Sequence, residues 1–551
     1  MKLDKASFLL MLCFMLVIKS NGQLVNNGAT IKIETGALVF AGGDVQNINS
    51  GIISNDGKLE VQGSFTNSAT YNSVTLDDSL IMSGTGDVTL NGGGSTISYL
   101  TINKTANTNN VTLTGTTLLG TKLDYTSGNF TTDPVTNPSY VFSAPVAAVF
   151  NFAAGREITG NVKRTSWVNG AAVIFNQTNM LVTTNGGTAP ADFMVTMIPQ
   201  TAGGDPTQAE REVKRKFLFT QTGGTGFTSD IRFAYQDAEL NTNTEANLVP
   251  WDLVTTEWNG RLTPVTRDVT ANYVSTTGIS FAELSNEWKL ADPRYTFNAT
   301  TFLRGPWNGT TAMNTNLNSG GIIPLSQPYN TTPFNYSGTE SVAAIPNANV
   351  VDWVLVEFRK PSTGLPTDAL SSTIIGRKAG FLLNNGTVVD LDGVTPIAYD
   401  ITKQGAGFVV VRHRNHLGVM SNAVPSNAAG TFANDFSSLA NSYKPSGAAS
   451  NPVVLLAGVG GKYGMWAGDA NKSGAVSASD ISAIKLAIAN SISGYTFTDT
   501  NLTGAVSASD LSLGKSTIAS SGTGGTSLKQ VVGNNNSKII TNIPDAVQAE
   551  H

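Results

Sequence analysis

The sequence predicts a mainly β fold, and three features predict it. Charged residues make up 13% of the 551 residues, about half the usual share, so the chain lacks the Glu, Lys and Arg that cover helical bundles. Glycine is abundant, with 56 residues, and Asn, Ser and Thr are frequent, which is typical of short strands joined by tight turns. Apolar and polar residues alternate over short stretches. A chain of this length is expected to form several domains.

Residues 1–22 have the pattern of a secretory signal peptide. Lysines precede an apolar run over residues 8–18, and Ser20-Asn21-Gly22 offers a cleavage site between small residues. The run is too short to span a membrane as a mature helix, and it contains the only cysteine, Cys13. We therefore expect an exported protein, extracellular or on the outer cell surface, whose mature chain has no transmembrane segment and no disulfide. An uncleaved N-terminal anchor is the alternative.

Residues 23–133 predict a β-solenoid. Short alternations such as Leu59-Glu60-Val61 and Val88-Thr89-Leu90 place two apolar side chains on one face and a polar one on the other. Turns such as Asp56-Gly57 separate them. Each strand buries little alone, but coils stacked on one another form a continuous core. A sandwich of short strands is the alternative.

Two β-sandwich-like domains are expected to follow, over residues 134–293 and 294–461, because the strands become longer. Lys214-Arg215-Lys216 starts one of these strands, and its position indicates a solvated strand edge with alternating faces. The clearest strands are those at residues 193–198, 217–219, 231–235, 350–358 and 408–414.

A nine-residue motif is duplicated near the C-terminus. Residues 474–482 recur at 504–512, with eight of nine positions identical and Ile481 replaced by Leu511. Apolar residues at helical spacing follow the first copy, and a helix is expected after each. The duplication indicates two copies of one structural unit, which we place at 466–520, followed by a linker and a polar tail without a fold at 521–551.

Each copy fits a twelve-residue calcium loop. Such a loop supplies oxygen at positions 1, 3, 5, 7, 9 and 12 and has Gly at position 6, here Gly474 and Gly504. Position 7 acts through its backbone carbonyl and position 9 through a water. Only two positions per loop are carboxylates, so we expect Ca²⁺ affinity at the weak, extracellular end; a degenerate loop is the alternative. The expected ligands are Asp469, Asn471, Ser473, Ala475, Ser477 and Asp480, and then Asp499, Asn501, Thr503, Ala505, Ser507 and Asp510.

The duplication and the ligand spacing together resemble the dockerin module, a paired calcium loop and helix best known from cellulosomal enzymes. The resemblance covers about residues 467–520. It implies that loop positions 10 and 11, Ala478-Ser479 and Ala508-Ser509, help to bind a cohesin-like partner. The chain departs from dockerins at position 5, which is Ser473 or Thr503 instead of Asp or Asn. Asp at position 12 is allowed in dockerins, whereas EF-hands have Glu.

A second resemblance covers residues 295–461 and is carried above all by Arg412-His413-Arg414-Asn415-His416-Leu417. The segment is similar to a β-sandwich unit of secreted Bacteroidetes proteins that are often labelled hemagglutinin. In those proteins the unit directly precedes a dockerin-like pair. The resemblance implies a modular secreted or surface protein without implying a particular activity. Such proteins often end in a sorting domain, for which the chain after residue 520 is too short.

Composition and motifs exclude several functions. The formal net charge is −5 and the sequence has no basic arm or stripe, so a nucleic-acid partner is not expected. The chain has three histidines, and His413 and His416 lack a third ligand by spacing. We expect a structural role for them, with the neighbouring arginines paired to Asp352 or Glu357. If the segment is a strand, His413 and Asn415 share one face.

No catalytic residues are predicted. Glycosidases need two carboxylates that face each other, and neither Asp390 with Asp392 nor Asp352 with Glu357 meets that need by spacing. Nucleotide, zinc-protease and serine-hydrolase motifs are absent from the sequence. Among the tryptophans, Trp307 is the best candidate for stacking on a sugar.

The sequence thus predicts a non-catalytic, exported, multidomain β protein for adhesion or assembly. Calcium would order its helical pair, either as a docking module or as an intramolecular cap on the preceding sandwich. A glycan or another cell-surface ligand is a further expected partner. The alternative is an extracellular polysaccharide-degrading or carbohydrate-binding component carried by the dockerin-like module.

Overall fold

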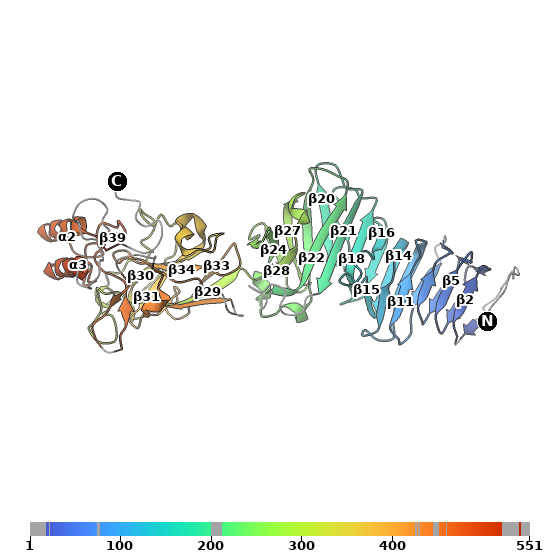
Figure 1. Ribbon diagram of the computed structural model, residues 1–551, viewed down its shortest axis with the longest axis horizontal. Coiled ribbons are helices and arrows are strands. Elements are labelled where there is room, and N and C mark those ends of the chain that lie inside the picture. Colours follow the sequence, from blue (N-terminus) through green and yellow to red (C-terminus); the bar gives the residue numbers. More distant parts are fainter. Residues whose placement is uncertain are drawn as a thin grey trace. The chain divides into compact units, whose positions relative to one another are not determined.

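The computed structural model is mainly β, with 44% of the residues in strands and 10% in helices (Figure 1). It describes residues 22–73, 78–199, 212–424, 427, 430–444, 451–458 and 460–520, and two short strands at 18–20 and 539–540. Residues 1–17, which include Cys13 and all but the last residue of the apolar run of the predicted signal peptide, lie outside these residues, as does most of the tail. The chain forms two compact units, divided between Asp292 and Pro293. Within the described ranges, no helix is long and apolar enough to cross a membrane.

The first unit begins with a β-solenoid of about seven turns. Strands one turn apart pair in parallel, with Leu24 opposite Val45 and Val45 opposite Phe65. One ladder contains β1 (Ile18–Ser20), β4 (Leu38–Ala41), β7 (Lys58–Val61), β10 (Ser79–Met82), β12 (Thr96–Asn103), β14 (Thr117–Ser127), β16 (Phe142–Pro145) and β17 (Val149–Phe152). A second contains β2 (Leu24–Asn27), β5 (Val45–Ile48), β8 (Phe65–Asn67), β11 (Val88–Asn91), β13 (Asn110–Leu113), β15 (Asn129–Thr131) and β18 (Ile158–Thr165). A third contains β3 (Thr30–Ile33), β6 (Ile52–Asn55) and β9 (Thr70–Ser73).

The parallel ladders continue beyond residue 133, where the sequence had suggested the end of the solenoid. β16 pairs with β18 in parallel, from Phe142 opposite Val162 to Pro145 opposite Thr165. The strands lengthen here, but their apolar side chains still point into the same core. Strand length alone therefore did not mark the change of architecture.

A column of buried asparagines runs along the solenoid. Asn26 Nδ2 donates to Asn47 Oδ1 at 2.9 Å, and Asn47 Nδ2 donates to Asn67 Oδ1 at 2.7 Å. Asn47 also donates to the carbonyl of Thr70, at 2.8 Å, and Asn67 to that of Gly92, at 3.0 Å. The column therefore also supplies hydrogen-bond donors to backbone carbonyls beside it.

The solenoid passes into antiparallel sheets at β18, which pairs with β21. This sheet continues through β21 (Asp192–Pro199), β22 (Glu212–Thr222), β28 (Trp288–Ala291), β24 (Val249–Val254) and β25 (Glu257–Gly260). A second sheet contains β19 (Val173–Ile174), β20 (Leu181–Asn185), β23 (Thr228–Ala234), β27 (Tyr273–Ser280) and β26 (Val265–Asp268). The two sheets share a core in which the rings of Phe217 and Phe233 lie 5.2 Å apart.

The basic run in β22 is not a solvated edge. β22 pairs with strands on both sides, and Arg215 is buried, whereas Lys214 and Lys216 are partly exposed. The faces alternate as expected, but Arg215 points inward to Glu157 and Glu239, at 3.0 and 2.8 Å. A paired arginine can occupy an interior position that an unpaired one cannot.

The second unit contains a three-stranded and a five-stranded sheet. The ring of Phe297 packs on Tyr399 at 4.3 Å and on Phe358 at 5.5 Å, so the two sheets share a core. The smaller sheet contains β33 (Ile397–Asp400), β29 (Arg294–Thr300) and β36 (Thr431–Asp435). The larger contains β32 (Val388–Val389), β31 (Ile374–Leu383), β30 (Val350–Arg359), β34 (Phe408–Arg412) and β35 (Val419–Met420).

Two longer helices follow, one after each copy of the duplicated motif. Ser477 is the N-cap of α2 (Ala478–Ala489), and its amide donates to the Asp480 carboxylate at 2.8 Å. The equivalent bond at the start of α3 (Ala508–Ser520) is 2.9 Å long. α2 and α3 pack against each other (Figure 1).

Shorter elements complete the described structure. In the second unit they are α1 (Asn316–Ser319), β37 (Val454–Leu455), β38 (Tyr463–Gly464), and β39 (Ala475–Val476) paired with β40 (Ile539–Ile540). Single 3-10 turns lie at Asp237–Glu239, Glu245–Asn247, Glu283–Ser285, Pro366–Asp368, Ser371–Thr373 and Leu439–Asn441.

Candidate functional site

The two copies of the duplicated motif form two loops with the same backbone path. Position 4 of each loop, Lys472 and Leu502, has a positive φ, of 66° and 57°. Position 6, Gly474 and Gly504, has φ values of 76° and 85°. Glycine adopts this left-handed conformation without steric cost, so the sixth position allows the sharp turn that the sequence pattern predicted.

The carboxylates at positions 1 and 12 are both turned onto the loop. In the first loop, Asp469 Oδ2 accepts from the Gly474 amide at 3.1 Å, and Asp480 Oδ1 accepts from the Asn471 amide at 3.1 Å. The second loop repeats both bonds. The amides of Gly504 and Asn501 donate to Asp499 and Asp510, at 2.7 and 3.0 Å.

Neutral oxygens lie close to each other on the same loops. Ser473 Oγ is 3.2 Å from the Ala475 carbonyl oxygen, and Thr503 Oγ1 is 3.2 Å from that of Ala505. Oxygens that share a calcium ion at 2.3–2.6 Å lie about 3–4 Å apart. The spacing of positions 5 and 7 therefore fits that of calcium ligands.

The side chains at positions 3 and 9 serve the loop backbone and the helix start. Asn471 Oδ1 accepts from the Ser473 amide at 3.0 Å. Ser477 Oγ lies 2.8 Å from Ser479 Oγ at the first turn of α2. The described part of the chain holds no cluster of three or more His, Cys, Asp or Glu that could bind a metal. The donor set is thus two carboxylates plus neutral oxygens in each loop, which fits a hard cation such as Ca²⁺ with modest affinity.

Two of the loop carboxylates, those of Asp480 and Asp499, have raised pKa values. Burial raises the pKa of Asp480, against the hydrogen bonds from the Ser477 and Asn471 amides. Burial also raises the pKa of Asp499, and the nearby Asp510 adds to this, against hydrogen bonds from the loop amides. A cation between Asp499 and Asp510 would offset the repulsion between these two carboxylates.

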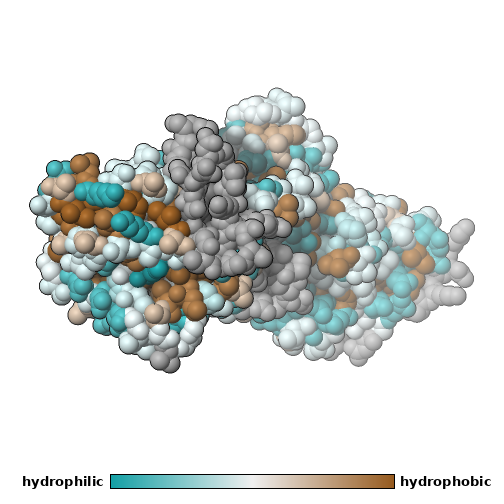
Figure 2. All heavy atoms as spheres, turned by 60° about the vertical axis from the view of Figure 1, so that its left-hand side comes forward, coloured by the Kyte–Doolittle hydropathy of each residue, from teal (hydrophilic) through white to brown (hydrophobic). Residues whose placement is uncertain are grey.

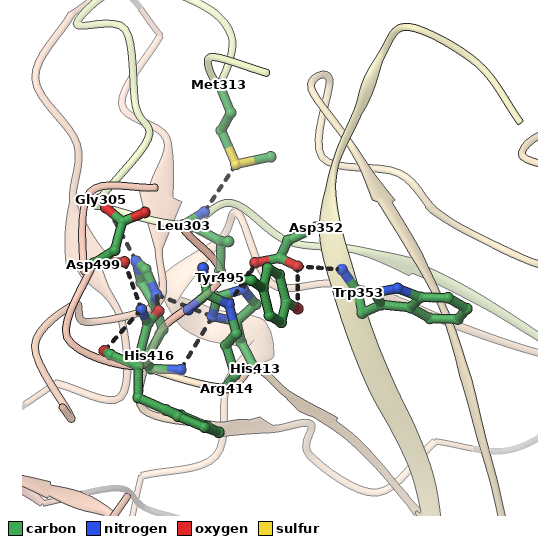
Figure 3. A network of polar contacts seen from close by, with 12 residues as sticks. Leu303, Gly305, Met313, Asp352, Trp353, His413, Arg414, His416, Tyr495 and Asp499 are labelled. Atoms are coloured by element: carbon green, nitrogen blue, oxygen red, sulfur yellow. Dashed lines mark hydrogen bonds and ion pairs between the residues drawn. The ribbon is translucent and has the colours of Figure 1, made fainter. Parts of the chain in front are cut away.

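Beside the second loop lies a buried polar network centred on Asp352 (Figure 3). Its carboxylate accepts from Arg414 Nε at 2.9 Å, from the Tyr495 hydroxyl at 2.6 Å and from His413 Nε2 at 3.2 Å. Burial alone would raise the pKa of Asp352, but Arg414 and His413 outweigh it and hold this pKa at about 2. Asp352 is therefore a fully ionised anchor for three donors from two distant segments.

The two histidines form a chain of neutral hydrogen bonds. The Gly305 amide donates to His416 Nε2 at 3.0 Å, so the proton of His416 is assigned to Nδ1, which lies 3.1 Å from His413 Nδ1. His413 Nδ1 is then an acceptor, so the proton of His413 is on Nε2, which faces Asp352. Burial lowers the pKa of both rings, and for His416 well below its ordinary value. These contacts confirm that the two histidines are hydrogen-bonded at the end of a strand, as expected for a structural role.

The predicted pairing of the arginines is confirmed, but the alternation of faces expected for a strand does not extend to residues 413–416. Arg412 Nε contacts Glu357 at 3.0 Å, and Arg414 contacts Asp352. His413 and Arg414 nevertheless both reach Asp352, although adjacent residues of a strand face opposite ways. The reason is that β34 ends at Arg412, so the alternation no longer applies to the residues after it.

The carboxylates considered for glycoside hydrolysis are each bound to other groups. Glu357 lies 2.8 Å from Arg359, and Asp390 lies 2.8 Å from Lys378. Asp392 accepts from the Val394 and Thr395 amides, both at 2.9 Å, and so stabilises a turn. None of these bonds indicates a general acid facing a nucleophile or base.

The tryptophans are mostly part of the core. Trp251, Trp288 and Trp353 are fully buried. Trp307, the candidate for sugar stacking, is half-buried; its Nε1 donates to the Ala457 carbonyl at 2.6 Å, and its ring lies 5.2 Å from that of Phe302, edge to face. The described tryptophans therefore do not present a shared stacking platform.

The position of Tyr495 and Arg304 at this site could not be read from the sequence. Arg304 Nη1 donates to Thr517 Oγ1 of α3 at 2.8 Å, although the two residues are more than 200 positions apart. Neither residue belongs to a repeated or spaced pattern.

Comparison with known proteins does not place the chain in a family. No family model matches it, and neither a curated protein nor a solved structure does. The resemblances to dockerins and to hemagglutinin-type proteins therefore rest on the residues of the motifs alone.

Proposed function

We propose that the loops at 469–480 and 499–510 bind Ca²⁺, and that the ions fix α2 and α3 as a cap on the sheets of the second unit. The protein would be exported, non-catalytic and of the adhesion or assembly type. The observation that carries this proposal is the repeated loop geometry, in which both carboxylates and the neutral oxygens of each copy are turned onto the same loop.

An intramolecular cap is favoured over a freely hinged docking module. Leu502, at position 4 of the second loop, is fully buried in the same core as Leu317 and Trp353. Arg304 holds Thr517 and Ser516 of α3, at 2.8 and 3.1 Å. These contacts join the helical pair to the sheets within one compact unit.

Docking of a cohesin-like partner is still compatible with this cap. Loop positions 10 and 11 are exposed in both copies. Figure 2 shows hydrophobic side chains gathered on the face of the second unit that is turned forward, and Leu486 of α2 is 64% exposed. We therefore propose that these exposed residues of the helical pair bind a protein partner, or a glycan at the cell surface.

We also propose that the antiparallel sheets that follow the solenoid in the first unit, and the sheets in residues 294–461, are sandwiches of the predicted kind. The packing of Phe297 between the two sheets of the second unit supports this. Export through the predicted signal peptide is proposed on the sequence pattern alone. Nothing in the described structure favours the polysaccharide-degrading alternative, because the candidate carboxylates already have partners.

The test is calorimetric titration of Ca²⁺ into the chain without residues 1–22, after treatment with a chelator. The whole chain is required because Leu502 and Tyr495 belong to the core of the second unit. We expect two sites with dissociation constants of about 0.1–1 mM, and 5 mM Ca²⁺ should then stabilise the folded state by about 1–2 kcal/mol per site.

Asp469→Ala and Asp499→Ala should each remove one site. Asp392→Ala is the matched control, because it removes a turn-capping carboxylate of the same unit outside the loops. Heats in the wild type no larger than those of a double Asp469→Ala/Asp499→Ala variant would show that the loops are degenerate.

A further inference from the structure

Asn415 lies between the first residues of the two loops and touches both through different groups. Its side chain and backbone are fully buried. Its carbonyl oxygen accepts from the amide of Asp469, position 1 of the first loop, at 3.2 Å. Its Nδ2 donates to the carbonyl of Asp499, position 1 of the second loop, at 2.7 Å, and to that of Phe497 at 3.1 Å.

The orientation of the Asn415 amide is fixed by its neighbours. Nδ2 faces two carbonyl oxygens, which only a donor can satisfy, and Oδ1 lies 2.9 Å from His416 Nδ1, whose one proton is shared between Asn415 Oδ1 and His413 Nδ1. His416 also forms an antiparallel bridge with Ala467, just before the first loop. Asn415 is therefore held between the two loops by its hydrogen bond with His416.

An ion bound in either loop must fix the position of that loop's first residue, since its carboxylate is a ligand. Through Asn415, fixing one first residue restricts the other, because both hydrogen bonds depend on the same buried side chain and peptide. A second ion then binds to a loop that is already ordered, which produces positive cooperativity.

We propose that Asn415 couples the two calcium loops, so that each ion raises the affinity of the other site about five- to tenfold. This inference rests on the calcium binding proposed above. Asn415 acts here as a positioning residue, since it contributes no ligand itself. It gives the Arg-His-Arg-Asn-His-Leu motif a function in joining the duplicated loops, beyond its place in the core.

The experiment is a cycle of calcium titrations on the chain without residues 1–22. Asp499→Ala and Asp469→Ala report each site with the other disabled, and Asn415→Ala removes the side-chain bonds to the second loop but keeps the carbonyl that holds the first. We expect cooperative binding in the wild type and independent sites in Asn415→Ala. The affinity of the first site in Asp499→Ala should be unchanged, within twofold, when Asn415→Ala is added.

Asn176→Ala is the matched control. Asn176 is also fully buried, and it also clamps two carbonyls, those of Ile158 and Gly160, but in the first unit. Asn176→Ala should lower the free energy of unfolding without changing the cooperativity of calcium binding. A general loss of stability and a loss of coupling are thereby separated.

A second experiment does not use Asn415 variants, so it tests the coupling even if Asn415→Ala fails to fold. In Asp469→Ala, only the second loop can bind Ca²⁺, and hydrogen exchange should slow about tenfold in the amides of residues 467–469 when it does. Unchanged exchange there, independent sites in the wild type, or full cooperativity in Asn415→Ala would each overturn the coupling. Absence of any calcium binding in the wild type would instead overturn the proposed function.

Discussion

His413 and His416 make the second unit sensitive to acid. Both rings are buried and neutral, and burial lowers the pKa of each. The unfolded chain takes up protons near pH 6.5, whereas the folded chain does not, so stability is fully present above that pH and falls as the pH drops below it. The third histidine of the chain is its last residue, His551.

We therefore predict that the free energy of unfolding of the second unit falls between pH 7.5 and 5, with a slope of up to about 1.4 kcal/mol per pH unit for each histidine. Denaturant titrations across this range measure it. His413→Asn and His416→Asn should flatten the slope, although each variant also loses stability. A slope that is equally steep in the variants would assign the acid sensitivity to other groups. Below about pH 4 a second loss is expected, as Asp352, with its pKa of about 2, releases its partners.

At this scale the sequence predicted partners better than it predicted geometry. Pairing of Arg412 and Arg414 with Glu357 and Asp352 followed from the need to neutralise buried charge. The hydroxyl of Tyr495, which completes the Asp352 site, is 143 residues away and carries no local signal. Contacts of such long range depend on how the chain folds back, which composition and spacing do not encode.

The asparagine column is the element whose contribution to the solenoid is most open to measurement. Asn47 is hydrogen-bonded to its two neighbours in the column, Asn26 and Asn67, and its side-chain amide is fully buried. Asn47→Leu keeps the approximate volume but removes the bonds of Asn47 to Asn26, to Asn67 and to the Thr70 carbonyl. A buried polar group left unsatisfied costs about 1–3 kcal/mol.

We predict that Asn47→Leu lowers the free energy of unfolding of the first unit by about 2–4 kcal/mol, since more than one group loses its partner. Chemical denaturation followed by circular dichroism would show it. Asn27→Leu is the control, because Asn27 accepts from Asn49 on the exposed side of the solenoid. An equal loss of unfolding free energy in the two variants would show that the buried column contributes no more to stability than an exposed hydrogen bond does.

Elements with strict local rules were the most predictable from sequence. The loop turn needs Gly474 and Gly504, the helix start needs Ser and Asp three residues apart, and both follow from backbone geometry alone. The asparagine column was missed for a related reason. Its members recur at intervals of 21 and 20 residues, and only the stacking of the solenoid brings them together.

At the scale of the whole molecule, the chain has two compact units with separate sources of stability. The first contains the solenoid and its adjoining sheets, and the second contains the sheets and the proposed calcium cap. The sequence pattern suggested four folded domains between the signal peptide and the tail, because composition changes where strands lengthen or helices begin. Compact units follow shared cores instead, and Leu502 places the helical pair in the core of the sheets before it.

We accordingly predict two unfolding transitions in scanning calorimetry, of which Ca²⁺ shifts only one. Ions that bind the folded second unit stabilise it by mass action and leave the first unit unaffected. Asn47→Leu should lower only the calcium-insensitive transition, and Asp499→Ala should lower the response of the other. The shift should amount to several degrees at 5 mM Ca²⁺, since about 1 kcal/mol moves the midpoint of a domain of this size by about 2–4 °C. A single transition that responds to both substitutions would mean that the two units unfold together, and the cap would then stabilise the whole chain.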